Sequence, residues 1–169
     1  MVRSAEPDTR RVFVQHSLHI EKSIEAVTSA LTTGPRKWFP RIDGDGSAAV
    51  GPSVAGLGLR RKVRVSIGEP VAGGSWTEVP VAWHATSLTK MFPVMTGKVE
   101  LAPVDARVTR LTVRGMYEPP FGRLGKHLDD AFMHSVAEAT VRDLAESIAK
   151  RLDGASSARV SRSQQVLRP

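Results

Sequence analysis

The chain of 169 residues contains no cysteine. This absence excludes disulfide bonds, a thiolate nucleophile and every zinc site that uses sulfur ligands. It fits a reducing compartment, and we expect a cytoplasmic protein. The opening residues, MVRSAEPDTRR, carry charges but no apolar stretch of the kind that a secretion signal needs.

Long apolar runs are missing as well. Nowhere do about 18 apolar residues follow one another, so we expect no membrane-spanning helix. A phosphate-binding loop is also absent, because Gly44-Asp45-Gly46 has neither the GxGxxG spacing nor the lysine of a P-loop. No serine lies in a G-x-S-x-G nucleophile elbow. We therefore expect no cofactor.

Histidines are few, and their spacing argues against a metal site. His16 and His19 are three residues apart in an expected strand, so their side chains should point to opposite faces. His127 and His134 share a face of an expected helix, but no third ligand is evident. We expect no bound metal.

The chain has the length and apolar content of one globular domain. Apolar residues make up 41% of it, and a domain of this size folds without disulfides or metals. Periodic apolar patterns are confined to residues 11–152, so we expect the domain there. Residues 1–10 and 153–169 are polar, and we expect them to be flexible termini.

Alternating apolar and polar residues predict several strands. The first covers Val12–Ile20, with Val12, Val14, His16, Leu18 and Ile20 on one face. Residues 43–58 are rich in Gly, Ser and Ala, and we expect a loop and one weak strand. Four further strands are expected. One begins at Leu59, and the others cover Trp76–Leu88, Val94–Ala102 and Val108–Tyr117. Pro70–Gly74 should form a turn, and Pro80 should mark an edge or a bulge.

Three helices are expected. Ser23 can cap a helix that begins at Ile24 and ends before Gly34-Pro35, and Arg36–Phe39 can form one more turn. A long amphipathic helix should run from about Leu124 to Leu152, with Gly154 ending it. The expected fold is α+β: a curved antiparallel sheet of six or seven strands around this long helix, plus two short helices.

One stretch, from Tyr117 to Leu152, reads YEPPFGRLGKHLDDAFMHSVAEATVRDLAESIAKRL. It resembles the START-like (SRPBCC) superfamily and in particular its actinobacterial members. The same pattern fits two other segments: Phe92 to Val104, with the sequence FPVMTGKVELAPV, and the opening strand with its Ser-capped helix. This superfamily includes polyketide cyclase-like, Bet v 1-like and lipid-transfer proteins. The resemblance implies a helix-grip fold with a cavity between the sheet and the last helix. It implies binding of a small hydrophobic molecule, lipid-, sterol- or polyketide-like, or a cyclisation or dehydration reaction. It supplies no catalytic motif that could be carried over.

Apolar and aromatic side chains should converge between the sheet and the long helix. A lining of this kind suits a small apolar ligand, although the same residues could simply fill the core. His16 should point inward, where it could anchor a ligand hydroxyl or exchange a proton, or could be satisfied by a neighbouring carbonyl. Tyr117 could bring its hydroxyl to the same space, or it could pack under the long helix with its hydroxyl in solvent. The candidate ligand-binding residues are His16, Trp83, Met95, Leu111, Val113, Tyr117, Phe132 and Val136.

The formal net charge is +7. Basic residues share the outward parity of neighbouring strands, which could produce a positive surface that attracts phosphates. A solvated outer face explains the same residues, and the missing aromatic partners argue against single-stranded nucleic acid. Three hypotheses follow: a binder of a small hydrophobic molecule, a cyclase or dehydratase that uses His16 and Tyr117, and a basic surface module. The oligomeric state stays open. The basic residues are Arg60, Lys62, Arg64, Lys98, Arg110 and Arg114.

Overall fold

A computed structural model describes residues 11–40, 47–50, 53–54, 57–58, 61–85, 95–117 and 130–165. The strands are β1 (Val12–Ile20), β2 (Ser47–Val50), β3 (Ser53–Val54), β4 (Leu57–Gly58), β5 (Arg61–Ile67), β6 (Val71–Gly73), β7 (Trp76–Ala85), β8 (Met95–Pro103) and β9 (Thr109–Tyr117). The helices are α1 (Ile24–Thr32), α2 (Pro35–Trp38) and α3 (Asp130–Gln165).

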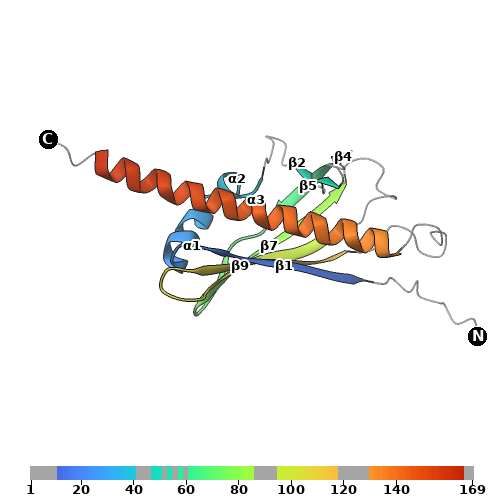
Figure 1. Ribbon diagram of the computed structural model, residues 1–169, viewed down its shortest axis with the longest axis horizontal. Coiled ribbons are helices and arrows are strands. Elements are labelled where there is room, and N and C mark those ends of the chain that lie inside the picture. The colour runs from blue at the N-terminus through green and yellow to red at the C-terminus, as the bar shows by residue number, and fades with distance from the viewer. Residues whose placement is uncertain are drawn as a thin grey trace, which may run out of the picture.

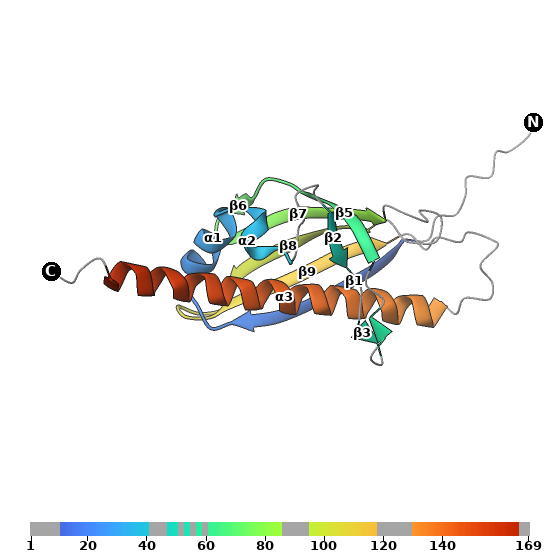
Figure 2. The same cartoon turned by 90° about the horizontal axis from the view of Figure 1, so that it is seen from above.

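Seven of the strands form one antiparallel sheet in the order β1-β9-β8-β7-β5-β2, with β6 pairing with β7 beside β5. The sheet lies beneath α3, and the short helices α1 and α2 lie at one end of it (Figure 1). Seen from above, α3 runs along the whole sheet and its C-terminal part extends past α1 (Figure 2). The expected helix-grip α+β architecture is confirmed.

Successive side chains of β1 point to opposite faces of the sheet, so every second side chain lies beneath α3. In the register of the sheet, Val12, Val14, His16 and Leu18 lie level with Tyr117, Gly115, Val113 and Leu111 of β9. Each of these rows continues into β8, so that the inward side chains of neighbouring strands stand side by side. The inner face is therefore a continuous surface of mainly apolar side chains.

The helix α3 covers this surface with a buried stripe at helical spacing. Its contacts with β1 and β9 are accompanied by contacts with α1 and α2, so the helix holds both layers of the domain together. Each apolar side chain that is fully buried in this way stabilises the fold by about 1.5–3 kcal/mol. The stripe consists of Val141, Leu144, Ala145, Ile148 and Leu152.

The first helix begins and ends as expected. The Ser23 hydroxyl accepts a hydrogen bond from the backbone N–H of Ala26 at 3.4 Å, which caps the free end of α1. The backbone N–H of Glu25 and the Ser23 hydroxyl donate to the Glu25 carboxylate and lower its pKa. Gly34 follows the helix with φ +125°, a left-handed conformation that a side chain would oppose.

Three expectations about the elements were wrong. In place of a loop and one weak strand over residues 43–58, the described residues of this segment form three short strands, β2, β3 and β4. Gly154 does not end the last helix, which continues to Gln165, so residues 153–165 are helical and not irregular. The segment Pro70–Gly74 is not only a turn, because Val71–Gly73 forms strand β6 against β7. Trp76 packs its ring over Gly73 at the end of this short hairpin, where a Cβ would overlap with it.

Pro80 lies where β7 changes partners. On the side of β7 that faces β5 and β6, residues 81–85 pair with β5 and residues 76–78 pair with β6. Pro80 lies between these two ladders, so neither of them needs an N–H from Pro80. The Pro80 carbonyl accepts a hydrogen bond from the Gly68 N–H at 2.9 Å, which closes the gap. The expected edge or bulge at this proline takes the form of a gap between the β5 and β6 ladders, whereas pairing with β8 continues through Pro80.

Two glycines face each other on the inner side of the sheet. Gly97 and Gly115 are cross-strand partners, and a Cβ on Gly97 would lie 2.8 Å from the Cα of Gly115 and overlap with the Arg114 carbonyl oxygen. A Cβ on Gly115 would overlap with the terminal methyl of Met95. The backbones therefore approach so closely that only glycine fits at position 97, whereas a side chain at position 115 would require Met95 to move.

We predict that Gly97→Ala lowers the free energy of unfolding by about 1–3 kcal/mol, because the added methyl must displace backbone and not a flexible side chain. Urea unfolding followed by circular dichroism measures the change. The control is Gly154→Ala, where a Cβ meets nothing within 4 Å and lies in a helix. It should raise stability by about 0.5–1 kcal/mol. Equal effects of the two substitutions would contradict the packing at Gly97.

Candidate functional site

The predicted site residues of the sheet all lie on its inner face. Trp83, Met95 and Tyr117 stand level with one another on β7, β8 and β9, and all three are buried. Val65 and Val12 extend this row to either side. An unbroken row with two aromatic rings and a thioether therefore crosses five strands on the inner face of the sheet.

Two further rows complete the inner face. His16 lies level with Val113, Val99 and Val79, and Leu111 lies level with Leu18 and Leu101. Leu111 and Val113 are buried, whereas His16 is half-buried. The remaining candidates, Phe132 and Val136, belong to α3, but their side chains lie outside the described residues.

The row of glycines separates the row of Tyr117 from the row of His16. Because Gly97 and Gly115 carry no side chains, this part of the inner face is lower than its surroundings, and Met95 lies across it. Methionine has three rotatable bonds and fills irregular gaps at little cost. The Met95 side chain can therefore give up this space to another apolar group.

Tyr117 is only 2% exposed, so its hydroxyl does not reach bulk solvent. The alternative in which this tyrosine packs with its hydroxyl in water is excluded. His16 and Tyr117 share the inner face but lie four residues apart along the strands, which is roughly 13 Å. With this spacing of their backbones, the two residues can contact the two ends of an elongated molecule.

The short helices contribute residues that the sequence did not point to as part of the interior. Trp38 and Phe39 are fully buried and meet edge to face, with ring centroids 5.9 Å apart and planes at 70°. They extend the aromatic character of the interior toward α1. The signal was present in the sequence, since two adjacent aromatic residues between Gly34-Pro35 and Pro40 are unusual for a surface turn.

Thr28 brings a polar atom into this interior. Its hydroxyl oxygen is shielded from solvent and has no hydrogen-bond partner among the described residues. Thr28 lies on the stripe of α1 that also carries Ile24 and Leu31. A buried hydroxyl without a partner costs about 1–3 kcal/mol, and a polar group of a ligand could remove that cost.

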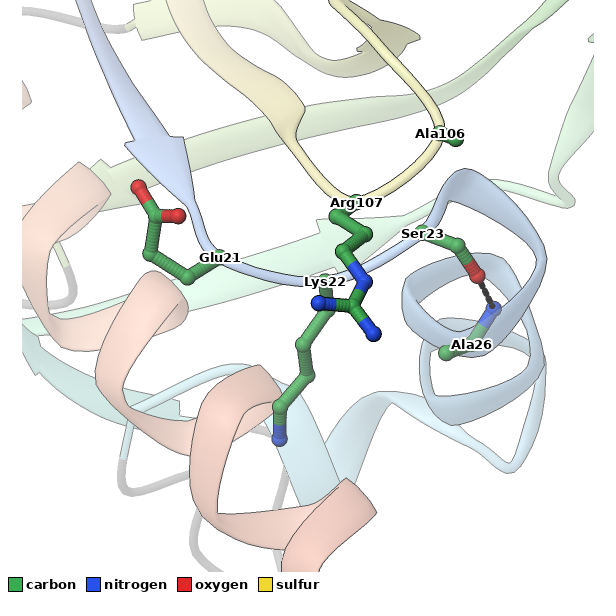
Figure 3. A pocket seen from close by; sticks show the side chains of 6 residues that line it. All are labelled: Glu21, Lys22, Ser23, Ala26, Ala106 and Arg107. Atoms are coloured by element: carbon green, nitrogen blue, oxygen red, sulfur yellow. Dashed lines mark hydrogen bonds between the residues drawn. The ribbon is translucent and has the colours of Figure 1, made fainter.

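A separate hollow of about 530 Å³ lies on the surface near α1 (Figure 3). Charged side chains dominate it, and it is not the apolar interior that the sequence predicts. Lys22 extends from it toward α3, where its ammonium group pairs with the Asp153 carboxylate at 3.1 Å and donates to the Asp153 carbonyl oxygen. This contact attaches the end of β1 to α3. The hollow is lined by Glu21, Lys22, Ser23, Ala26, Ala106 and Arg107.

The outer face of the sheet is mixed in charge and not a positive plate. Lys98 pairs with Glu78 at 2.6 Å, and Arg114 pairs with Glu100. Two of the basic residues that the sequence places outward are thus neutralised by acids on adjacent strands. Lys62, Arg64 and Arg110 are exposed, and Arg60 lies outside the described residues. This arrangement favours a solvated outer face.

Metal and membrane features are absent from the part of the chain that the structure describes. Its residues contain no group of three or more His, Cys, Asp or Glu side chains placed to hold a metal ion. None of its helices combines the length and the apolar character needed to cross a membrane.

No family model matches the chain, and no curated protein matches it. Solved structures do. A truncated norcoclaurine synthase from Thalictrum flavum is 11% identical, with 86% of this chain and 96% of that chain covered and a TM-score of 0.52. ZhuI aromatase/cyclase from Streptomyces sp. R1128 is 15% identical, covering 89% and 96%, with a TM-score of 0.46. Ara h 8.0201 is 10% identical, covering 88% and 99%, with a TM-score of 0.46.

The likeness to the norcoclaurine synthase concerns the fold. The chain has a helix-grip fold, which that synthase shares over most of its length. At such low identity the likeness concerns the fold alone. The chemistry of the interior has to be argued from the residues of this chain.

We predict that Thr28→Val raises the free energy of unfolding by about 1 kcal/mol, because it replaces a buried hydroxyl that has no partner with a methyl group. Urea unfolding measures it. The matched control is Thr112→Val, which removes the hydroxyl bond to Ser17 Oγ at 2.9 Å and should lower stability by about 1 kcal/mol. A loss of stability in both variants would mean that the Thr28 hydroxyl has a partner.

Proposed function

We propose that the protein binds a small hydrophobic molecule, lipid-, polyketide- or sterol-like, between the inner face of the sheet and α3. The observation that carries the proposal is the inner row of Trp83, Met95 and Tyr117 beside the Gly97–Gly115 pair. Sites for small apolar ligands combine aromatic walls with few polar groups, and this row supplies both.

The glycine pair and Met95 explain how such a molecule would gain room. Met95 covers Gly115 and can swing away, after which an apolar group could lie directly on the sheet backbone. The ligand would replace the packing contacts that Met95 gives up. At this position binding requires no opening of the sheet, because a change of rotamer of Met95 frees the space above Gly115.

Polar groups are sparse and widely spaced on this surface. His16 and Tyr117 would contact opposite ends of an elongated ligand, and the Thr28 hydroxyl offers a third polar contact from α1. The separation of His16 from Tyr117 favours binding over a reaction in which both exchange protons with one group. The fold is shared with a norcoclaurine synthase and is thus compatible with a site for a small organic molecule.

Titration with the fluorescent apolar probe N-phenyl-1-naphthylamine tests the proposal. We expect saturable binding with enhanced emission, and a rise in Tm as the probe concentration exceeds its Kd. A ligand at about 100 times its Kd adds roughly 2.7 kcal/mol of stability. Native mass spectrometry of protein purified from its source should show a bound species of lipid-like mass. The absence of both signals would refute the proposal.

We predict that Val113→Phe abolishes binding of the probe, because the added ring fills the inner face between His16 and Val99. Thr96→Phe is the matched control, since Thr96 is exposed on the outer face of β8, and binding should be unchanged. Met95→Ala is the second variant, which enlarges the space and should bind the probe at least as tightly. Equal affinity of all three variants and the wild type would place the probe elsewhere.

A further inference from the structure

The strand β1 forms one end of the main sheet. Its only partner among the described residues is β9, and no other described strand pairs with the opposite side of β1 (Figures 1 and 2). The strand is nine residues long. Within the described residues, no turn or loop hydrogen bond uses the backbone groups of Val12 to His19 on that edge.

The sequence of this strand lacks the residues that discourage an edge from pairing with another chain. Between Val12 and Ile20 the sequence VFVQHSLHI has no proline, lysine, arginine or acidic residue. Long edges without such residues are templates for strand addition. The charged residues Arg11 and Glu21 lie immediately outside the two ends of the strand.

An apolar patch borders the edge on the outer face. Phe13 is 54% exposed and Met116, its cross-strand partner on β9, is 42% exposed. Two large, exposed apolar side chains at cross-strand positions beside the edge indicate an interaction surface. The patch lies at the N-terminal end of β1.

We infer that two copies of this chain associate through β1, antiparallel and centred on His16, to form a continuous sheet across both. In this register Val12 meets Ile20 of the second copy and Val14 meets Leu18, so inward apolar residues match apolar ones. On the outer face Phe13 meets His19 of the second copy. Each Phe13 and Met116 patch is then covered by His19 and Arg110 of the other chain.

Charge complementarity selects this register. With His16 at the centre, Arg11 of each copy lies opposite Glu21 of the other, which gives two symmetric ion pairs at the ends of the interface. A shift that centres Gln15 places Arg11 opposite His19, and a shift that centres Ser17 places Phe13 opposite Glu21. Only the register centred on His16 matches apolar, polar and charged positions together.

Sedimentation velocity of the full chain across a concentration series tests the inference. We expect a reversible monomer–dimer equilibrium. Phe13→Lys should abolish the dimer, since it removes the apolar patch and places a lysine on the edge. Glu21→Arg should raise the dimer dissociation constant roughly tenfold, because like charges then meet at both ends. The double variant Arg11→Glu/Glu21→Arg should restore the wild-type value.

The rescue by the double variant is the decisive result, because it requires contact between the two positions in different copies. Circular dichroism and thermal melting of each variant show that the monomer is folded. The inference is overturned if the wild type is monomeric at every concentration, which would also be the result if this edge receives a peptide of another protein. It is equally overturned by a dimer that Phe13→Lys or the charge reversals leave unchanged.

Discussion

The packing of α3 against the inward rows of the sheet is the interaction on which the structure depends. The sheet has one apolar face, and no other described helix is long enough to cover it. Val141, Leu144, Ala145, Ile148 and Leu152 supply the covering stripe, and the burial of these side chains offsets the cost of ordering a helix of this length. The Lys22–Asp153 contact adds a second attachment of the helix, just past the end of β1.

The same inner face has to serve two opposing purposes if it binds a ligand. Close packing stabilises the domain, whereas a ligand needs room. The pair Gly97 and Gly115 reconciles them, because the strands approach closely there and Gly115 is covered by Met95, a side chain that moves easily. Buried apolar residues elsewhere on the face, such as Val99 and Leu101, keep the domain folded whether or not this space is occupied.

The sequence was sufficient for those parts of the fold that depend on local periodicity. Alternation along Val12–Ile20 gave the strand and the inward direction of His16, and the hydroxyl of Ser23 gave the start of α1. The inward placement of Trp83, Met95, Leu111, Val113 and Tyr117 followed from the same parity, and it is confirmed. Their role in binding stays a prediction.

Features that depend on register or on tertiary packing could not be read in the same way. The Lys98–Glu78 and Arg114–Glu100 pairs exist because β7, β8 and β9 are aligned in one particular register, and the parity of basic residues alone suggested a positive plate. Gly154 is a weak helix former, yet α3 continues through it, since a single glycine costs only about 1 kcal/mol. The strand β6 was hidden because VAGG has the composition of a turn.

The position of β1 links the interior to the surface of the molecule. One face of this strand carries His16 and Val14 into the space beneath α3, while its edge carries no protection against another strand. The strand cannot be given charges along the inward parity without damage to the apolar face that α3 covers, so protection could come only from the outward positions. Those positions hold Phe13, Gln15, Ser17 and His19, none of which is a charged residue that discourages pairing. The sequence of β1 thus favours the burial of its edge as well as of its inner face.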